Sequence, residues 1–524
     1  MLSCVDVTAE NPGECSLALI GLDIGTSGAK ALVVNARGRV LATAFSAYPM
    51  STAHPLWAEQ NTEDWWRATK RVLRAVLIQA RVRAVEVRGI GLTGQMHGLV
   101  LLDEAGSVLR PCIMWNDQRT GAECEQITQN IGSARLLELT GNPALPGFTA
   151  PKILWVRTHE PRIYERATHV LLPKDYIRYR LTGDFVSEMS DASGTSLLDV
   201  RNRRWSSEIL TSLEIPERWL PELVESPNRT GVISTMAAKA TGLKAGTPVI
   251  AGGGDQAAGA VGSGTVTEGV ISVTIGTSGV VFAHSDKYRV EPQGRLHAFC
   301  HAVPGSWHLM GVTLSAGGSL RWIRDRLCVE EKVLARKRGV DPYVVMMQTA
   351  AKSPAGSEGL LFLPYLSGER TPYPDPLARA ALIGLTLRHD KSHIIRSVLE
   401  GVAFSLRDCF ELMRPMGIPV NEVRVSGGGA RSPLWRQILS DVLQTPLSTV
   451  TTTEGAPYGA ALLAGVGSGI FGSVAEACGK TLRIGSTTNP GRDGQLYDDL
   501  YQTYRQAYPQ NRTLFHTLSR LKQQ

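Results

Sequence analysis

The segment LALIGLDIGTSGAKALVV (residues 17–34) contains the pentapeptide IGTSG, which recurs in VISVTIGTSGVVFAH (residues 270–284). Each copy separates two apolar, β-branched runs, a pattern that predicts two strands joined by a glycine turn. Two copies so far apart are too few for a solenoid, and they predict a duplicated domain instead. Each turn then offers backbone N–H groups to a phosphate. Two unrelated glycine turns are the alternative.

Length and composition fit a two-domain protein. The chain has 524 residues, more than one core usually holds, with 43% apolar and 20% charged residues. Strand-like segments alternate with amphipathic helices, which predicts an α/β fold. Glycine and small residues concentrate in GGGDQAAGAVGSGTVTEG, just before the second IGTSG. The predicted domains are therefore residues 17–264 and 265–524, after a loose extension of residues 1–16.

Two helices can be predicted in some detail. One begins after a cap at Asn61 or Thr62, because acidic residues follow and an amphipathic pattern continues from there. The other covers residues 394–410, IIRSVLEGVAFSLRDCF. Its apolar face is predicted to hold Ile395, Val398, Leu399, Val402 and Leu406.

Charge and cysteine usage narrow the function classes. The net charge of +7 comes from dispersed basic residues, which favours anionic small molecules over nucleic acid. The eight cysteines form no CxxC pair and no zinc spacing, so we expect free thiols in a reducing cytosol. Neither a signal peptide nor a membrane-spanning run is visible, and we expect a cytoplasmic protein with no membrane partner. We interpret His297 and His301 as structural rather than metal-binding.

Three more glycine clusters sit where strands are predicted to end. VIAGGGDQAAGAVG (residues 249–262) places Asp255 between a strand and a helix, where an aspartate often only caps the helix. VRVSGGGARSPLWRQILSDVL (residues 423–443) predicts a helix from about Pro433, and a helix N-terminus behind glycines is a favourable anion site. LSAGGSLRW (residues 314–322) adds a third cluster. No complete P-loop is present, and no GxGxxG stretch opens a βαβ unit as a dinucleotide-binding motif would.

Taken together, these motifs resemble the FGGY family of carbohydrate kinases over residues 18–510. The members that phosphorylate xylulose are the most similar, through GLTGQMHGLVLLD, RPCIMWNDQRT, PGFTAPKILWV, LLPKDYIRYRLTGDF and SDASGTSLLDV. The resemblance implies a duplicated actin-like ATPase fold, of the ribonuclease H type, with ATP in the cleft between the domains. It also implies ATP-dependent phosphorylation of D-xylulose to D-xylulose 5-phosphate, with Mg²⁺ as cofactor.

The resemblance assigns roles to individual residues. Asp255 is expected to be the general base that activates the sugar primary hydroxyl, and Asp23 to face the Mg²⁺-bound phosphates through water. The substrate-binding residues implied are Met96, His97, Gly98, Asp255 and Gln256. The ATP-binding residues implied are Gly25, Thr26, Ser27, Gly276, Thr277, Gly317, Gly428, Gly429 and Ser432.

One position departs from the family pattern. Many xylulose-phosphorylating members carry asparagine after the base, where this chain has Gln256. A side chain longer by one methylene changes discrimination by about 1–3 kcal/mol. A kinase for ribulose, gluconate or a pentitol therefore stays open, as does a non-catalytic actin-like ATPase on the same fold. The sequence leaves the oligomeric state open, with a homodimer as one option.

Overall fold

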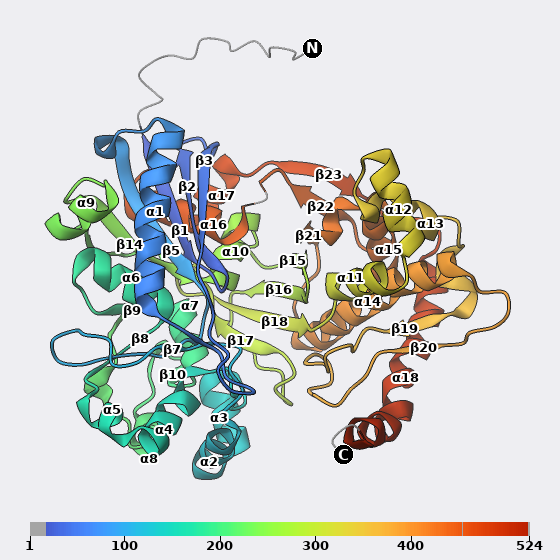
Figure 1. The fold of residues 1–524 in the computed structure, drawn as a ribbon, viewed down its shortest axis with the longest axis horizontal. Coiled ribbons are helices and arrows are strands. Elements are labelled where there is room, and N and C mark those ends of the chain that lie inside the picture. Colours follow the sequence, from blue (N-terminus) through green and yellow to red (C-terminus); the bar gives the residue numbers. More distant parts are fainter. Residues whose placement is uncertain (1–16, 453, 522–524) are drawn as a thin grey trace, which may run out of the picture.

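The structure, a computed structural model, describes residues 17–452 and 454–521. Two mixed sheets lie side by side, each with helices packed against it (Figure 1). The first sheet is built from the N-terminal half of the chain and the second from the C-terminal half. The predicted extension, residues 1–16, lies outside the described residues.

The N-terminal sheet has six strands in the order β13-β14-β5-β1-β2-β3. β1, β2 and β3 form an antiparallel meander, while β5 and β14 extend the sheet parallel to β1. The strands are β1 (Ala18–Ile24), β2 (Gly28–Asn35), β3 (Val40–Ala47), β5 (Val87–Gly94), β13 (Arg229–Val232) and β14 (Pro248–Gly254).

The C-terminal sheet has seven strands and repeats this plan. In it, β15, β16 and β18 form the antiparallel meander, and β21 and β22 continue parallel to β15. Both copies of IGTSG therefore join the first two strands of a meander, and the predicted duplication is confirmed. The strands are β15 (Val270–Ile275), β16 (Gly279–Ser285), β17 (His297–Cys300), β18 (Trp307–Thr313), β21 (Glu422–Ser426), β22 (Leu447–Val450) and β23 (Ile484–Thr488).

The two helices predicted in detail are present. α1 (Thr62–Ala80) is capped by Asn61, whose side chain accepts a hydrogen bond from the Glu63 amide at 2.9 Å, and it packs on β2 and β3. α14 (Lys391–Met413) crosses the core of the C-terminal half, and the five residues of its predicted apolar face are fully buried.

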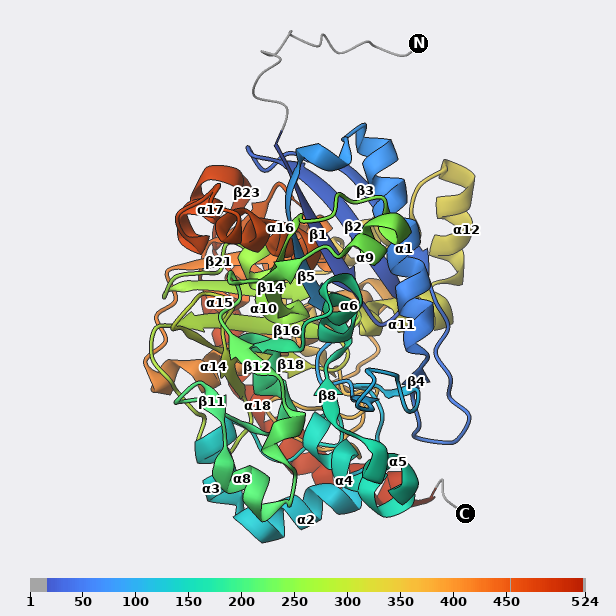
Figure 2. The same ribbon diagram turned by 90° about the vertical axis from the view of Figure 1, so that its left-hand side faces the viewer.

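The connection between β5 and β14 is a helical region with its own apolar core, seen below the N-terminal sheet in Figure 2. The helices of this connection are α2 (Gly121–Ile131), α3 (Ser133–Thr140), α4 (Thr149–His159), α5 (Pro161–Arg166), α6 (Pro173–Thr182), α7 (Met189–Ala192), α8 (Ser207–Ser212) and α9 (Thr235–Thr241). Of these, α6 and α9 pack on α1 and share the core of the N-terminal sheet. The helices that cover the C-terminal sheet, with α14, are α11 (Gly317–Arg326), α12 (Val329–Arg338), α13 (Pro342–Ala350), α15 (Pro433–Leu443) and α18 (Gly494–Arg520).

Two helices pack against each other where the halves meet. α10 (Asp255–Ser263) contacts α16 (Gly455–Gly467), and α16 also lies against β1 and β5 (Figure 1). The approach is so close that a Cβ on Gly459 would lie 1.8 Å from the carbonyl oxygen of Ala258. A side chain at this position would push the two helices apart, so glycine is required there.

Two further features concern the chain as a whole. Among the described helices, none combines the length and the apolar character needed to cross a membrane. The six described cysteines are free and buried, and the other two, Cys4 and Cys15, lie outside the described residues.

Candidate functional site

Three segments of the predicted site follow the carboxyl ends of neighbouring parallel strands. Thr93 of β5 pairs with Asp23 of β1 on one side and with Gly253 of β14 on the other. The strand ends are therefore level with one another. The first glycine turn, the stretch around His97 and the helix that begins at Asp255 all leave this one edge of the sheet. Sequence reasoning proposed these segments separately, and the sheet brings them together.

The first glycine turn has its carbonyl groups tied to the protein. The Tyr48 hydroxyl donates to the Gly25 carbonyl at 2.5 Å, and the Gln60 amide donates to the Thr26 carbonyl at 2.7 Å. The Ser27 carbonyl accepts from the Tyr48 amide at 3.3 Å. Within the described residues, the amide hydrogens of Thr26 and Ser27 find no protein acceptor. The turn therefore presents donors to the space beyond the sheet, as an anion site requires.

The second glycine turn is fixed in a similar way by the start of α11. Gly276 O accepts from the Gly317 amide at 2.8 Å, and Thr277 O accepts from the amides of Ala316 and Gly318, both at 2.9 Å. The Thr277 amide has no acceptor in the part of the chain that the structure describes. The turn and the helix N-terminus thus form one donor-rich corner.

The residue before the glycine turn is Asp23 in the N-terminal half and Thr274 in the C-terminal half, and the surroundings of the two side chains explain the difference. The Thr274 hydroxyl lies 3.0 Å from the Ser426 hydroxyl of β21. That side chain is satisfied within the sheet. Asp23, in contrast, has a buried carboxylate oxygen, Oδ1, with no hydrogen-bond partner among the described residues. A buried, unpartnered carboxylate oxygen fits a group that interacts with a cation from outside the protein.

The pKa of Asp23 is raised to about 7, first by burial and second by the nearby Asp255, while Lys30 opposes the shift. Lys30 itself pairs with Glu454 across the two halves, at 2.5 Å. Asp255 therefore lies close enough to Asp23 to influence the ionisation of Asp23.

Asp255 is the first residue of α10 and directly follows β14. The helix N-cap is Gly254, and no side-chain capping hydrogen bond is made there. Capping therefore does not account for the carboxylate. Burial raises the pKa of Asp255 to about 6, and hydrogen bonding from Gln256 partly offsets this effect. A carboxylate with a pKa just below neutrality is ionised at physiological pH and is a competent proton acceptor.

His97 is held in a defined orientation. Its Nδ1 lies 2.6 Å from the Gly194 carbonyl oxygen, and its ring stacks on Phe148 with the centroids 4.4 Å apart. Burial lowers the pKa of His97 to about 3, so the imidazole is neutral. Because Nδ1 must donate to the carbonyl, Nε2 carries the lone pair and can accept a hydrogen bond from a sugar hydroxyl.

The residues before and after His97 in the sequence pack closely against other segments of the protein. Met96 is buried against Gly254, where an added Cβ would meet its Sδ at 3.0 Å. At Gly98 an added Cβ would lie 2.6 Å from Cγ of Pro173. Gly98 therefore packs closely against α6, and its implied contact with the sugar stays a prediction.

Lys152 is a site residue that sequence reasoning missed. Its Nζ donates to the carbonyl of His97 at 2.8 Å and to the carbonyl of Gly147 at 2.7 Å, and the Thr149 hydroxyl adds a bond to His97 O at 3.1 Å. These donors hold His97 at φ +69°, a left-handed conformation that a non-glycine residue adopts only when its surroundings enforce it. Lys152 lies in PGFTAPKILWV, which marked the region but not this contact.

A cavity of about 830 Å³ opens in the C-terminal half, between the second glycine turn and helices α11, α13 and α15. It is large enough for a nucleotide. Six of the predicted ATP-binding residues line it, namely Gly276, Thr277, Gly317, Gly428, Gly429 and Ser432. The residues of the first turn, with Asp23, His97 and Asp255, are not part of its lining.

One wall of this cavity was not foreseen from the sequence. It is formed by α13, which contributes Tyr343, Val344, Met347 and Gln348, and by Leu320 of α11. The structure reveals this wall through exposure, because Val344 is 46% exposed although it is apolar, and exposure is not visible in a sequence. Ser432, at the opposite wall, also caps α15 by accepting from the Trp435 amide at 3.2 Å.

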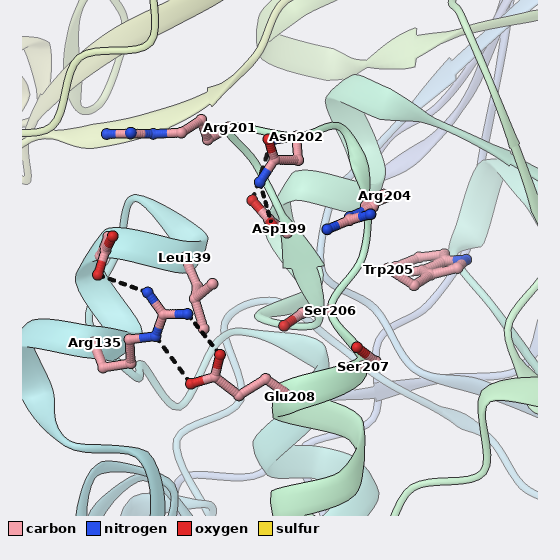
Figure 3. A pocket seen from close by; sticks show the side chains of 11 residues that line it. Arg135, Leu139, Asp199, Arg201, Asn202, Arg204, Trp205, Ser206, Ser207 and Glu208 are labelled. Carbon is pink, nitrogen blue, oxygen red and sulfur yellow. Dashed lines mark hydrogen bonds and ion pairs between the residues drawn. The ribbon is translucent and has the colours of Figure 1, made fainter.

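A second cavity, of about 210 Å³, lies in the helical region and is polar (Figure 3). Several of its polar side chains already pair with one another: Arg135 donates to Glu208 at 2.6 and 2.9 Å, and Asn202 donates to Asp199 at 2.7 Å. None of the predicted site residues lines it. We assign no part of the site to this cavity.

Comparison with family models matches residues 18–262 to the N-terminal domain, and residues 271–468 to the C-terminal domain, of the FGGY family of carbohydrate kinases. The chain belongs to this family. Sugar kinases of this family use ATP as co-substrate, so the chain is an ATP-dependent sugar kinase. The predicted fold class, two α/β domains of the actin-like ATPase type, is confirmed.

Individual relatives cover nearly the whole FGGY chain. A xylulose kinase of Escherichia coli is 41% identical over 94% of this chain and 98% of its own length. The solved structure of a xylulose kinase from Rhodospirillum rubrum superimposes with a TM-score of 0.87 at 30% identity, covering 95% of this chain and all of the other. A gluconokinase of Bacillus subtilis is 32% identical over 89% of this chain and 91% of its own length.

Proposed function

We propose that this FGGY kinase transfers the γ-phosphoryl group of ATP to the primary hydroxyl of D-xylulose, giving D-xylulose 5-phosphate and ADP. The observation that carries the proposal is the convergence of the first glycine turn, His97 and Asp255 at one edge of the N-terminal sheet. The similarity to xylulose kinases along the whole chain supports the choice of sugar.

In the proposed mechanism, each residue has one task. The carboxylate of Asp255 accepts the proton of the sugar hydroxyl as its oxygen attacks the γ-phosphorus. Nε2 of His97 accepts a hydrogen bond from another hydroxyl and so orients the sugar, while Gln256 contacts it beside the base. The amides of the two glycine turns hold the phosphates from opposite halves.

Mg²⁺ is the proposed cofactor. The fit rests on Asp23, whose buried oxygen has no partner in the part of the chain that the structure describes and whose strand leads into the first glycine turn. Asp23 would hold the ion through water, since Mg²⁺ keeps several waters and takes few protein ligands. Bound there, the ion supplies positive charge that offsets the charge of the phosphates.

The nucleotide is proposed to occupy the 830 Å³ cavity. Gly428, Gly429 and Ser432 would contact the adenosine, Gly317 the ribose or a phosphate, and the apolar side chains of α13 the base. An assay of ADP release with D-xylulose, D-ribulose, gluconate and pentitols tests the function directly. Turnover is expected to be fastest with D-xylulose, and no sugar-dependent ADP release at all would contradict a kinase function.

Gluconate is the second candidate substrate. The gluconokinase relative favours it, and so does Gln256, which departs from the asparagine of many xylulose-phosphorylating members. A higher kcat/KM for gluconate than for D-xylulose in the same assay would select this function. An ATPase that drives assembly would release ADP without any sugar.

The division into domains, the cellular compartment and the assembly are also part of the proposal. We keep residues 17–264 and 265–524 as the two domains, with α10 and α16 at their junction. The free, buried cysteines support a reducing compartment such as the cytoplasm. A homodimer is the proposed assembly, to be tested by light scattering coupled to gel filtration.

A further inference from the structure

A cluster of five fully buried charges lies beneath the sugar end of the site. Its members are Lys174, Asp175 and Arg178 of α6, Glu188 at the end of β9 (Val186–Glu188), and Asp191 of α7. Nζ of Lys174 lies 2.7 Å from Asp175, 3.4 Å from Glu188 and 3.1 Å from Asp191. Burying charges costs free energy that pairing seldom recovers in full, so such a cluster is weak evidence for stability. None of these five side chains has a role in the proposed phosphoryl transfer as described so far.

Glu188 is the most heavily bonded member of this cluster. Its carboxylate accepts from the Ser190 amide at 2.7 Å, the Ser190 hydroxyl at 2.9 Å and the Asp191 amide at 2.9 Å. The Ser226 hydroxyl adds a fourth bond at 2.8 Å. The two serines come from segments on either side of Glu188 in space, and the carboxylate fixes both.

Both serines also hold the end of β14, the strand that leads into Asp255. The Ser190 hydroxyl accepts from the Gly254 amide at 3.0 Å, and the Ser226 carbonyl accepts from the Gly252 amide at 2.9 Å. This end of β14 is irregular, because its register against β5 shifts between Ile250 and Gly253. Gly252 has φ +77° there, and a Cβ would lie 1.6 Å from the Leu92 carbonyl oxygen. An irregular strand end needs such anchors to hold one position.

The same segment reaches the sugar-contacting histidine. α7 begins directly after Glu188, and two residues beyond its end lies Gly194, whose carbonyl oxygen is 2.6 Å from Nδ1 of His97. Residues 188–194 therefore contact both the strand before Asp255 and the ring of His97. One carboxylate at the start of this segment sets the position of both.

We propose that Glu188, acting through Ser190, is a positioning residue of the phosphoryl transfer: it fixes the strand end that carries Asp255 and the segment that orients His97. This rests on the proposed function, in which Asp255 is the base. A displacement of about 1 Å at a reacting group can cost on the order of 10²-fold in rate, so the anchors matter even though they touch no substrate.

The test compares two serines, each of which donates a hydrogen bond to a carboxylate of the cluster. Ser190→Ala removes the bridge between Glu188 and Gly254, whereas Ser187→Ala removes a hydroxyl that donates only to Asp175, at 2.7 Å. Both changes leave a buried carboxylate one donor short, so similar losses of thermal stability are expected. We expect Ser190→Ala to lower kcat with D-xylulose about tenfold and Ser187→Ala to lower it less than twofold. The affinity for ADP, measured by calorimetry, should stay unchanged in both.

Asp255→Asn is measured in the same series. If the two serine variants have equal kcat while Asp255→Asn is inactive, the positioning role is overturned and the base assignment stands. If Asp255→Asn keeps near-normal turnover, the base assignment fails, and the link from Glu188 to catalysis fails with it. Glu188→Gln is the second variant, expected to lower kcat at least as much as Ser190→Ala. Wild-type kcat in folded Glu188→Gln would also overturn the proposal.

Discussion

Asp23 and Asp255 leave the same edge of the N-terminal sheet, from two parallel strands that are separated only by β5. Neither carboxylate has its ordinary pKa: burial raises the pKa of both, and the nearby Asp255 raises that of Asp23 further. Two carboxylates in one site can serve different roles when their surroundings differ. Here one stands behind a phosphate-binding turn and the other starts a helix beside the sugar-contacting histidine.

A pH dependence follows from the position of Asp255. Only the ionised carboxylate accepts a proton, and its pKa is raised to about 6. At saturating Mg²⁺–ATP, kcat/KM for D-xylulose reports the pKa of the base before the sugar binds, so it should be flat above about pH 7 and fall toward tenfold per unit below pH 6. The measurement is kcat/KM for D-xylulose between pH 4.5 and 8. An acid limb centred near pH 4, the range of an ordinary aspartate, would contradict the environment described for Asp255.

Much of this site could be predicted because its segments are locally encoded. The glycine turns at Gly25 and Gly276 lie between β-branched runs, and Asp255 follows an apolar strand, so each pattern is complete within about 15 residues. The contact from Lys152 to the carbonyl of His97 spans 55 residues and depends on how α4 packs within the helical region. A contact between residues so far apart leaves no periodic pattern in the sequence that could predict it.

The nucleotide cavity shows the same limit. Its glycine corners were predicted, but its α13 wall became visible only when residues 342–350 were placed opposite the second turn. Gly98 shows a related limit, since the sequence marks this glycine and only the structure shows that Pro173 approaches it. A glycine in a motif indicates close approach without saying what approaches.

Two adjacent glycines should separate nucleotide binding from folding. Gly428 has φ −62° and ψ −39°, and an added Cβ would meet nothing, so Gly428→Ala should fold normally while its methyl enters the cavity. At Gly429 the Cβ would lie 2.4 Å from Cγ2 of Ile275, and overpacking should cost about 1–3 kcal/mol of unfolding free energy. We expect about tenfold weaker ADP binding in Gly428→Ala, or about 1.4 kcal/mol, by calorimetry. Unchanged ADP affinity there would move the adenosine away from this corner.

The two halves are expected to close during the reaction. Asp255 belongs to the N-terminal half, whereas the nucleotide cavity is lined by the C-terminal half, so the base and the γ-phosphate must be brought together. Closure also excludes water, which would otherwise accept the phosphoryl group. Small-angle scattering should show a smaller radius of gyration with D-xylulose and a non-hydrolysable ATP analogue than without ligands. Identical dimensions in both states would rule out a closing motion.

Sugar selectivity should depend on His97. His97→Ala removes the acceptor Nε2 and the stack on Phe148, so KM for D-xylulose should rise at least about tenfold while KM for ATP changes less than twofold. His301→Ala is the matched control, because it removes a buried imidazole whose Nε2 lies 3.0 Å from the Thr265 carbonyl oxygen. It should lower stability without this selective effect. Equal changes in both KM values for His97→Ala would return His97 to a purely structural role.

The decisive prediction concerns Asp255→Asn. The substitution keeps the size of the side chain and some hydrogen bonding but removes the proton acceptor and its charge. Loss of a general base typically lowers the rate about 10²- to 10⁴-fold, so kcat with D-xylulose should fall by at least that much. The nucleotide cavity lies in the other half, and ADP affinity by calorimetry should stay within about threefold, a change below 1 kcal/mol.

The thermal stability, ADP binding and turnover of Asp255→Asn would also reveal a wrong assignment of this residue. Because Gly254 is the N-cap of α10 and no side chain caps that helix end, the variant should unfold at nearly the wild-type temperature. A large drop in melting temperature together with lost ADP binding would mean that the carboxylate holds the junction of the two halves together. Turnover close to wild type, with the fold intact, would refute the base assignment, and the proton acceptor would then have to be sought at Asp23, the other carboxylate at this edge of the sheet.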